Sequence, residues 1–252
     1  LSQSIAKMNR HFLAKKEDDS HTNLYFDTLQ RALIGQWMKT EIGPVLFRLN
    51  LNSWSFEFVN TQFKILLGLD LQITKLHHIE ESLIDSLLTL GIKSAGFRES
   101  MHYQIPNYEL EDDCLQKVHP SDIEQWMTFR SAANNACYQI LGSFQKKGAV
   151  RIWPHHFDTG IFIQASDRLN LGFGLAMSDH YCEQAYFYAN AYTLEGKSIA
   201  IDKHEHPLEA GIWLNSPDFK GAILSLKEVK FSKEDILRKY IRSFLKTYLS
   251  LG

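Results

Sequence analysis

Apolar residues in the first part of the chain recur at the spacings of amphipathic helices. Over residues 22–39 they lie three and four positions apart, which predicts a helix that ends at Gly43-Pro44. The same spacing predicts a second helix over residues 75–90, with Thr74 as its N-cap and Gly91 at its C-terminal end. We therefore expect one helix on each side of the segment between residues 43 and 74.

Two apolar runs, residues 45–51 and 54–59, separate these predicted helices. In the second run Trp54, Phe56 and Phe58 alternate with more polar residues, which is the period of a half-buried strand. Residues 92–118 carry no clear period, and we expect irregular structure or short strands there.

A capping-box pattern, Ser121-Asp-Ile-Glu124, opens the clearest helical stripe of the chain, which continues as far as Gly148. We expect the Ser121 hydroxyl to accept a hydrogen bond from the backbone N–H of Glu124. Since the pattern marks a helix start, Ser121 is the expected N-cap.

A last helix is predicted to begin at Ser232, with Glu234 and Asp235 in its first turn, where carboxylates favour the helix dipole. Its apolar residues fall in pairs along residues 235–249, with Ile241 and Leu245 among them. We expect this stripe to be buried.

Residues 149–226 have the character of strands joined by polar loops. The predicted fold class is α+β, a C-terminal antiparallel sheet of about five strands flanked by three or four helices. The predicted strands are residues 150–164, 169–177, 185–192, 211–214 and 221–226.

Residues 1–21 are polar and charged, with Ile5, Met8 and Phe12 at a rough helical spacing. A short docking helix and a loose arm both fit this pattern. The remaining residues, 22–252, are predicted to form a single α+β domain.

Composition excludes several classes of protein. The chain has 252 residues, 44% of them hydrophobic, so it has ample material for a core. Lys and Arg number 27 against 29 Asp and Glu, which gives no general attraction to nucleic acid or to an anionic membrane. We therefore expect neither nucleic acid nor a membrane as a partner. A small molecule is a possible partner, and the sequence leaves any cofactor unknown.

Cysteine usage and the absence of targeting signals favour the cytoplasm. Cys114, Cys137 and Cys182 are widely spaced and form no CxxC pair, which argues against a disulfide framework. No apolar run approaches the length of a spanning helix, and the N-terminus shows no signal peptide.

The densest polar cluster is Trp-Pro-His-His-Phe-Asp, residues 153–158. On an extended backbone His156 and Asp158 would share one face and His155 the other. A histidine and a carboxylate two residues apart can bind one metal ion, or the carboxylate can orient the histidine as a general base. The competing interpretation is a hydrogen-bonded structural histidine and an aspartate that caps a turn.

A second group of polar residues follows in the loop with Asp179 and Glu183 and in the next strand, where Tyr186 and Tyr188 share a face. These side chains could wall a polar pocket, or they could form the rim of a core. We expect His155 or His156 to lie near this loop or this tyrosine face.

Other histidine runs are weaker candidates. Residues 202–206, Asp-Lys-His-Glu-His, could bind zinc but are more typical of a solvated loop, and His77-His78 falls on the polar side of its predicted helix. There is no HExxH, GxSxG, Walker glycine loop or GxGxxG.

The strings RIWPHHFDTGIFI, LGFGLAMSD, AYFYANAY and GIWLNSPDFKGAILSL resemble a bacterial domain-of-unknown-function family of uncharacterised proteins. The resemblance covers residues 149–226, and the N-terminal half is similar more weakly, through residues 22–39 and 101–108. This chain has Ala185 where many members carry proline, and Gly211-Ile-Trp-Leu214 where they carry a histidine-rich segment. The resemblance implies a shared fold and supplies no reaction.

Three functions compete. The first is a small-molecule-binding or catalytic pocket. The second is a non-catalytic structural or interaction module. The third is a metal-assisted hydrolase that uses His156 and Asp158. The pocket of the first function would be walled by His155, His156, Asp158, Asp179, Glu183, Tyr186 and Tyr188.

Overall fold

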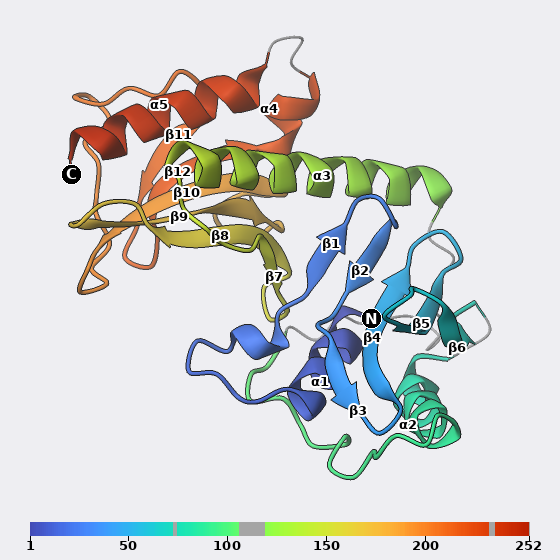
Figure 1. Cartoon of the computed structure of the whole chain (residues 1–252). Helices are drawn as coiled ribbons and strands as arrows, with labels where there is room; N and C mark the ends of the chain where they lie inside the picture. The colour runs from blue at the N-terminus through green and yellow to red at the C-terminus, as the bar shows by residue number, and fades with distance from the viewer. Residues whose placement is uncertain (73–74, 106–118, 232–234, 252) are drawn as a thin grey trace. The chain divides into compact units, whose positions relative to one another are not determined.

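The computed structural model describes residues 1–72, 75–105, 119–231 and 235–251 (Figure 1). Contacts group the chain into two compact units: residues 1–131 with 151–157, and residues 132–150 with 158–252. The single domain expected over residues 22–252 remains a prediction that an unfolding experiment can test. Thr74, Cys114, Ser232 and Glu234, and the expected irregular structure over residues 106–118, lie outside the described residues.

The first unit contains an antiparallel sheet with strand order β1-β2-β4-β5-β6, in which β3 also pairs with β4. Mixed helices and antiparallel strands confirm the α+β class. A sheet in the N-terminal half of the chain was not predicted. Its strands are β1 (Tyr25–Asp27), β2 (Ala32–Ile34), β3 (Met38–Thr40), β4 (Gly43–Asn50), β5 (Ser55–Asn60) and β6 (Ile65–Asp70).

The helix predicted over residues 22–39 is wrong, because this segment forms β1, β2 and β3 after a short 3₁₀ turn, η1 (Ser20–Thr22). Asp27 Oδ1 accepts hydrogen bonds from the backbone N–H groups of Leu29 and Gln30, both at 2.9 Å, and so closes a turn between β1 and β2. Arg31 then adopts a left-handed φ of 54°, which no α-helix allows. The apolar spacing of three and four therefore arises from short strands and the turns between them.

The strands predicted over residues 45–51 and 54–59 are confirmed as β4 and β5, with two corrections. Phe56 and Phe58 are fully buried, but Glu57 on the opposite face is buried as well, so the strand is not half-exposed. Arg48, its directly paired neighbour on β4, binds Glu57 with Nε 2.7 Å from Oε2. Trp54 lies before β5, in the four-residue turn after β4.

Two helices belong to the first unit alone. Helix α1 (Ser2–Phe12) buries Ile5 and Met8 completely, which confirms the docking helix rather than the loose arm. Helix α2 (Ile79–Thr89) follows a 3₁₀ turn, η2 (Leu76–His78), and confirms the second predicted helix. Gly91 has a φ of 70° just after α2, as expected of a residue that ends a helix.

Helix α3 (Pro120–Ser143) confirms the third predicted helix but corrects its start and its end. It begins before Ser121 and ends before Gly148. The Ser121 hydroxyl lies 2.7 Å from His119 Nδ1 and does not bond the N–H of Glu124. The backbone carbonyl of His119 accepts a hydrogen bond from the N–H of Ile123 at 3.3 Å, so the first helical bond starts at His119. The capping-box prediction, which made Ser121 the N-cap, is therefore wrong.

The sheet of the second unit has the strand order β11-β12-β10-β9-β8 and is antiparallel throughout. This confirms the predicted C-terminal antiparallel sheet, but it is one of two sheets, and the described residues form five α-helices instead of the expected three or four. A sixth strand, β7 (Arg151–Trp153), belongs to the first unit, where Ile152 bridges Leu24. The strands of the second unit are β8 (Asp158–Gln164), β9 (Leu169–Ala176), β10 (Tyr186–Thr193), β11 (Ile212–Asn215) and β12 (Lys220–Ser225).

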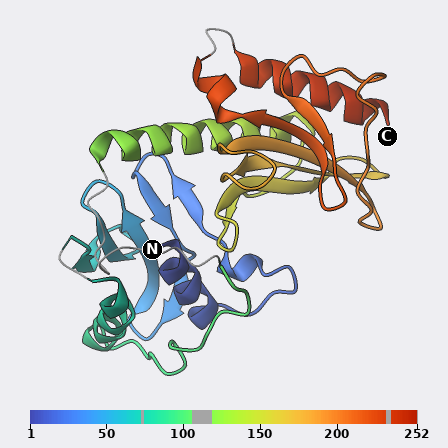
Figure 2. The same ribbon diagram turned by 180° about the vertical axis from the view of Figure 1, so that it is seen from behind.

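One face of this sheet packs against the last helix, α5 (Ile236–Ser250), as Figures 1 and 2 show. Phe244 stacks on Phe173 of β9 at 5.5 Å, and the hydroxyl of Tyr240 donates to the Ala222 carbonyl at 2.8 Å. Ile241 and Leu245 are only half-buried. The expected burial therefore holds for the face that carries Tyr240 and Phe244.

The end of the predicted stripe is wrong, because Leu249 is exposed. Asp235 is the N-cap of α5: its side chain accepts a hydrogen bond from the backbone N–H of Arg238 at 3.1 Å. A short helix that the sequence analysis did not expect, α4 (Leu226–Phe231), follows β12. Among the described residues, no helix combines the length and the apolar character needed to span a bilayer.

Candidate functional site

The Trp-Pro-His-His-Phe-Asp segment forms a tight turn between β7 and β8 instead of a continuous strand. Phe157 has a left-handed φ of 56°, and its backbone N–H donates to the Trp153 carbonyl at 2.7 Å. The expectation that His156 and Asp158 share one face of an extended strand is therefore wrong. Pro154 and the left-handed Phe157 bend the chain at this point.

The two histidines of this turn belong to the first unit. His155 is half-buried, and its ring lies 5.5 Å from the ring of Tyr103 and 4.3 Å from that of His156. Burial, together with the neighbouring His156, lowers the pKa of His155, so this imidazole is neutral at pH 7. His156 itself is exposed.

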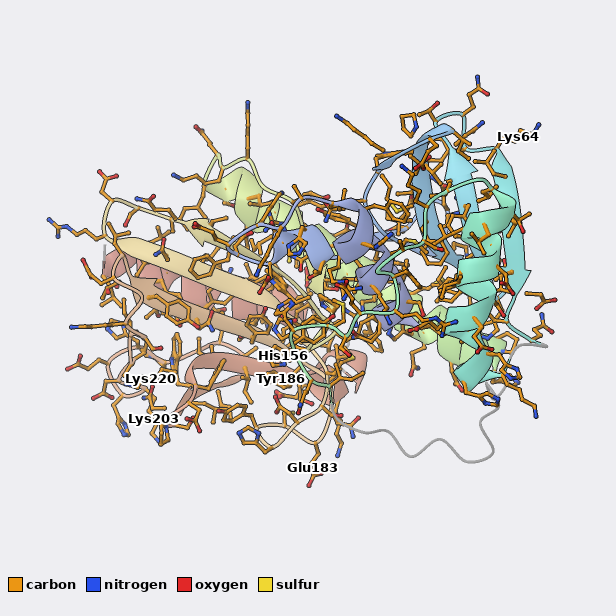
Figure 3. The ribbon with its side chains drawn as sticks, turned by 90° about the horizontal axis from the view of Figure 1, so that it is seen from below. Lys64, His156, Glu183, Tyr186, Lys203 and Lys220 are labelled. Atoms are coloured by element: carbon orange, nitrogen blue, oxygen red, sulfur yellow. The ribbon has the colours of Figure 1, made fainter. Side chains whose placement is uncertain are left out.

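The other five predicted site residues belong to the second unit, where four of them form two separate pairs. The hydroxyl of Tyr188 donates to Asp158 Oδ2 at 2.8 Å, and that of Tyr186 donates to Asp179 Oδ2 at 2.7 Å. Glu183 is exposed, and Figure 3 shows its side chain pointing away from the ribbon. Both hydrogen bonds thus lie within the second unit, one inside the sheet and one between the sheet and its adjoining loop.

The described part of the chain holds no group of three or more histidine, cysteine, aspartate or glutamate side chains placed to bind a metal ion. His156 and Asp158, the predicted metal candidates, therefore belong to no such group among the described residues. Residues 202–206 form a turn in which Asp202 Oδ1 accepts from the N–H of His204 at 2.8 Å, consistent with the solvated loop.

A largely apolar cavity of about 420 Å³ lies within the first unit, and Phe157 of the predicted segment is part of its lining. We call this cavity the aromatic pocket. Its lining comes from the turn after β4, from α3, from the neighbouring strands and from the start of α1. The lining residues are Leu1, Ser2, Leu33, Leu49, Leu51, Trp54, Asp122, Ile123, Trp126 and Phe157.

The wall of the aromatic pocket is held by ring contacts and a buried arginine. Trp126 stacks on Phe157 with ring centroids 6.0 Å apart, and Phe26 meets Trp126 edge-on at 5.5 Å. The Arg130 guanidinium, only 1% exposed, lies over both rings of the stack, and its Nη2 donates to the Phe157 carbonyl at 2.6 Å. These contacts fix the ring and the backbone of Phe157 together.

Trp54 and Phe157 share an unusual backbone conformation. Both have a positive φ, 54° and 56°, which bulky residues rarely adopt and which costs about 1–3 kcal/mol at each position. Both line the aromatic pocket. Glycine or asparagine would suit either turn at less cost. The fold thus maintains two strained backbone positions that place aromatic rings in the wall of one cavity.

A smaller cavity of about 210 Å³ shares Leu51, Trp54 and Ile123 with the aromatic pocket. We call it the polar cavity, because Arg31, Asn52, Gln72 and Glu124 also line it. Arg31 and Glu124 form an ion pair across the cavity lining. The two cavities are therefore neighbours, one mainly apolar and one polar, and Trp54 lines both.

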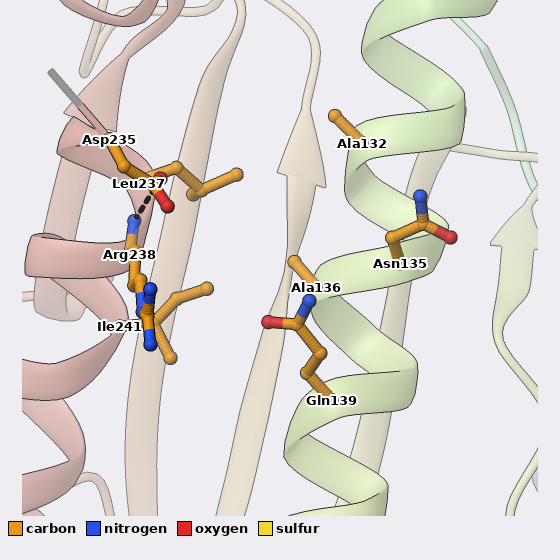
Figure 4. Close-up of a pocket in the computed structure, with 8 residues that line it drawn as sticks. All are labelled: Ala132, Asn135, Ala136, Gln139, Asp235, Leu237, Arg238 and Ile241. Carbon is orange, nitrogen blue, oxygen red and sulfur yellow. Dashed lines mark hydrogen bonds between the residues drawn. The ribbon is translucent and has the colours of Figure 1, made fainter.

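The second unit has a groove of about 410 Å³ between α3 and α5 (Figure 4). Ala132 and Ala136 of α3 lie on one side, and Leu237 and Ile241 of α5 lie on the other. Asp235 already caps α5 there, so its carboxylate is engaged. No aromatic side chain lines this groove, in contrast to the aromatic pocket.

The sequence singled out the segment that contains Phe157, but none of the residues that line the aromatic pocket was a predicted site residue. No family model, no curated protein and no solved structure matches this chain. The fold and the site define an α+β protein with an aromatic-walled cavity beside the Trp-Pro-His-His-Phe-Asp turn.

Proposed function

We propose that this protein binds a small, mainly apolar molecule in the aromatic pocket. The observation that carries the proposal is that Trp54 and Phe157 hold costly left-handed conformations while lining the same cavity. Backbone strain of this kind persists where the surrounding structure imposes it, and it is concentrated at binding and catalytic sites. This proposal keeps the predicted small-molecule pocket but centres it on Phe157 instead of on His156.

Size and lining support the same function. Small-molecule sites occupy roughly 300–1,000 Å³ and are lined mainly by apolar and aromatic side chains with a few polar groups. The aromatic pocket, at about 420 Å³, has this character, with Asp122 and Ser2 as its polar side chains. Each 100 Å² of apolar ligand surface removed from water contributes about 2.5 kcal/mol before the cost of immobilising the ligand.

The strained positions provide a matched pair of variants that test this proposal. Trp54→Gly removes one wall of the pocket and relieves the backbone. Phe63→Gly relieves an equally left-handed aromatic residue, with φ of 58°, that is exposed and lies outside the pocket lining. Neither variant should lose stability through its backbone, because glycine adopts positive φ freely.

The probe is n-propylbenzene, followed by NMR through the indole N–H signals of Trp54 and Trp126. We expect saturable shifts of these signals in the wild type, about tenfold weaker binding in Trp54→Gly and unchanged binding in Phe63→Gly. Absence of saturable shifts in the wild type, or equal affinity of Trp54→Gly, would contradict the proposal.

A further inference from the structure

Two buried N–H donors belong to residues that line the polar cavity, and one of these residues, Trp54, also lines the aromatic pocket. The indole Nε1 of Trp54 and the guanidinium Nε of Arg31 are shielded from solvent, and neither has a hydrogen-bond acceptor among the described residues. Both residues line the polar cavity. A buried donor without an acceptor costs about 1–3 kcal/mol, so two of them beside one cavity indicate an acceptor that the described part of the chain does not supply.

The charges around these two donors decide which kind of acceptor fits. Glu124 already forms an ion pair with Arg31, so the guanidinium charge is balanced. Asp122 adds a second carboxylate to the lining of the aromatic pocket. An anionic ligand would therefore meet one balanced arginine and one unfavourable carboxylate, whereas a neutral acceptor avoids the repulsion.

We propose that the ligand is a neutral molecule with an apolar body and one carbonyl oxygen, of the amide, ester or ketone class. This inference rests on the proposed function, since the apolar body occupies the aromatic pocket. The carbonyl oxygen has two lone pairs and accepts from both Trp54 Nε1–H and Arg31 Nε–H. Trp54 then serves twice: its ring forms part of the apolar wall, and its N–H binds the polar group.

The test compares three probes that share a phenylpropyl body: n-propylbenzene, 3-phenylpropanamide and 3-phenylpropionate. Two conservative variants each remove one donor. Trp54→Phe keeps an aromatic ring in the wall and deletes the indole N–H. Arg31→Lys keeps the positive charge beside Glu124 and deletes the Nε–H group. Affinities are measured by calorimetry or NMR titration on the whole chain.

We expect 3-phenylpropanamide to bind more tightly than 3-phenylpropionate, and each variant to weaken the amide about tenfold more than it weakens n-propylbenzene. Unchanged amide affinity in both variants would overturn the inference and would indicate that water satisfies the two donors. Tighter binding of the carboxylate would also overturn it. In both cases the proposed function would stand if n-propylbenzene binds, whereas failure of all three probes would overturn both proposals.

Discussion

The hydroxyl of Tyr188 on β10 reaches across β9 to Asp158 on β8, where it donates to Oδ2 at 2.8 Å. Two glycines leave the space for this path. A Cβ atom added at Gly160 would lie 2.7 Å from the Tyr188 hydroxyl oxygen, and one added at Gly174 would lie 2.8 Å from it. The two glycines are paired in register on β8 and β9, and Gly174 pairs with Tyr188. The two glycines thus leave the space that the Tyr188 side chain occupies on this face of the sheet.

Replacing Gly174 by alanine should therefore destabilise the protein by about 3 kcal/mol. The new Cβ would lie 2.2 Å from the Thr159 carbonyl oxygen as well as against Tyr188. The control is Gly142→Ala on α3, where a Cβ meets nothing within 4 Å and the helix should gain about 0.5–1 kcal/mol. Urea unfolding of both variants measures the difference, and a Gly174→Ala midpoint at or above that of the wild type would refute this account.

Alkaline pH should destabilise the fold through its tyrosines. Burial, followed by the charge and the hydrogen bond of Asp158, raises the pKa of Tyr188 well above 10, and burial does the same for Tyr240. The unfolded chain loses these protons near pH 10 while the folded chain keeps them. Stability is therefore full below pH 10 and falls as the pH rises further.

The check is the urea midpoint measured from about pH 9 to 11, together with the ultraviolet absorbance of tyrosinate. Tyr188→Phe should lower stability at pH 7, because Asp158 loses a donor, but it should flatten the alkaline decline. A decline of the same steepness in the variant would show that Tyr188 does not contribute to it.

Acidic pH should destabilise the fold through two histidines of the first unit. Burial lowers the pKa of His155 and of His21 below 6.5. Below pH 6.5 the unfolded chain binds protons that the folded chain resists, so stability falls as the pH falls from about 7 to 5. His155→Gln should reduce this slope, whereas His204→Gln, at an exposed histidine far along the chain, serves as its control. Equal slopes in the two variants would remove His155 from the explanation.

The Arg48–Glu57 pair should behave as a buried ion pair. Both side chains are nearly inaccessible, and Asn50 Nδ2 also donates to Glu57 Oε1 at 3.0 Å. Glu57→Gln leaves the guanidinium without its counter-charge and should cost about 3 kcal/mol. The double variant Arg48→Met/Glu57→Leu should cost less than this single change. If instead the separate costs of Arg48→Met and Glu57→Leu simply add in the double variant, the side chains act independently.

Two helix starts give a direct comparison of capping. Asp235→Ala removes the acceptor of the Arg238 N–H and should destabilise the protein by about 1 kcal/mol. Ser121→Ala should have little effect, because Ser121 lies inside α3 and its hydroxyl contacts His119 instead of capping the helix. Thermal unfolding of both variants ranks them, and a larger loss in Ser121→Ala would restore the capping-box interpretation.

The C-terminal fold was predictable because its strands follow their local pattern. The alternation in residues 185–192 matches β10, and the paired apolar residues after Asp235 match α5. Residues 22–39 misled for a physical reason: three-residue strands linked by turns place apolar side chains three or four positions apart, as a helix does. In so short a segment, the Asx turn at Asp27 and the left-handed Arg31 decide the structure.

The aromatic pocket was only partly visible in the sequence. Phe157 drew attention through its polar neighbours, and Trp126 belonged to a correctly predicted helical stripe. Trp54, however, was predicted to lie in a strand. Its left-handed backbone conformation could not be predicted, because tryptophan in a sequence does not indicate a positive φ. Arg130 carries the charge of a surface residue, and the contacts that accompany its burial, with the two rings and with the Phe157 carbonyl, are not visible in the sequence.

Strand β6 ends the sheet of the first unit, and within the described residues it pairs only with β5. Ile65 and Leu66 on it are exposed, and its free edge offers backbone hydrogen-bonding groups to any extended peptide. Charged residues stand at its two ends, Lys64 and Asp70, and Figure 3 shows Lys64 at the margin of the sheet. These charges act as gatekeepers against strand-to-strand aggregation, so their neutralisation would limit the concentration at which the protein can be handled.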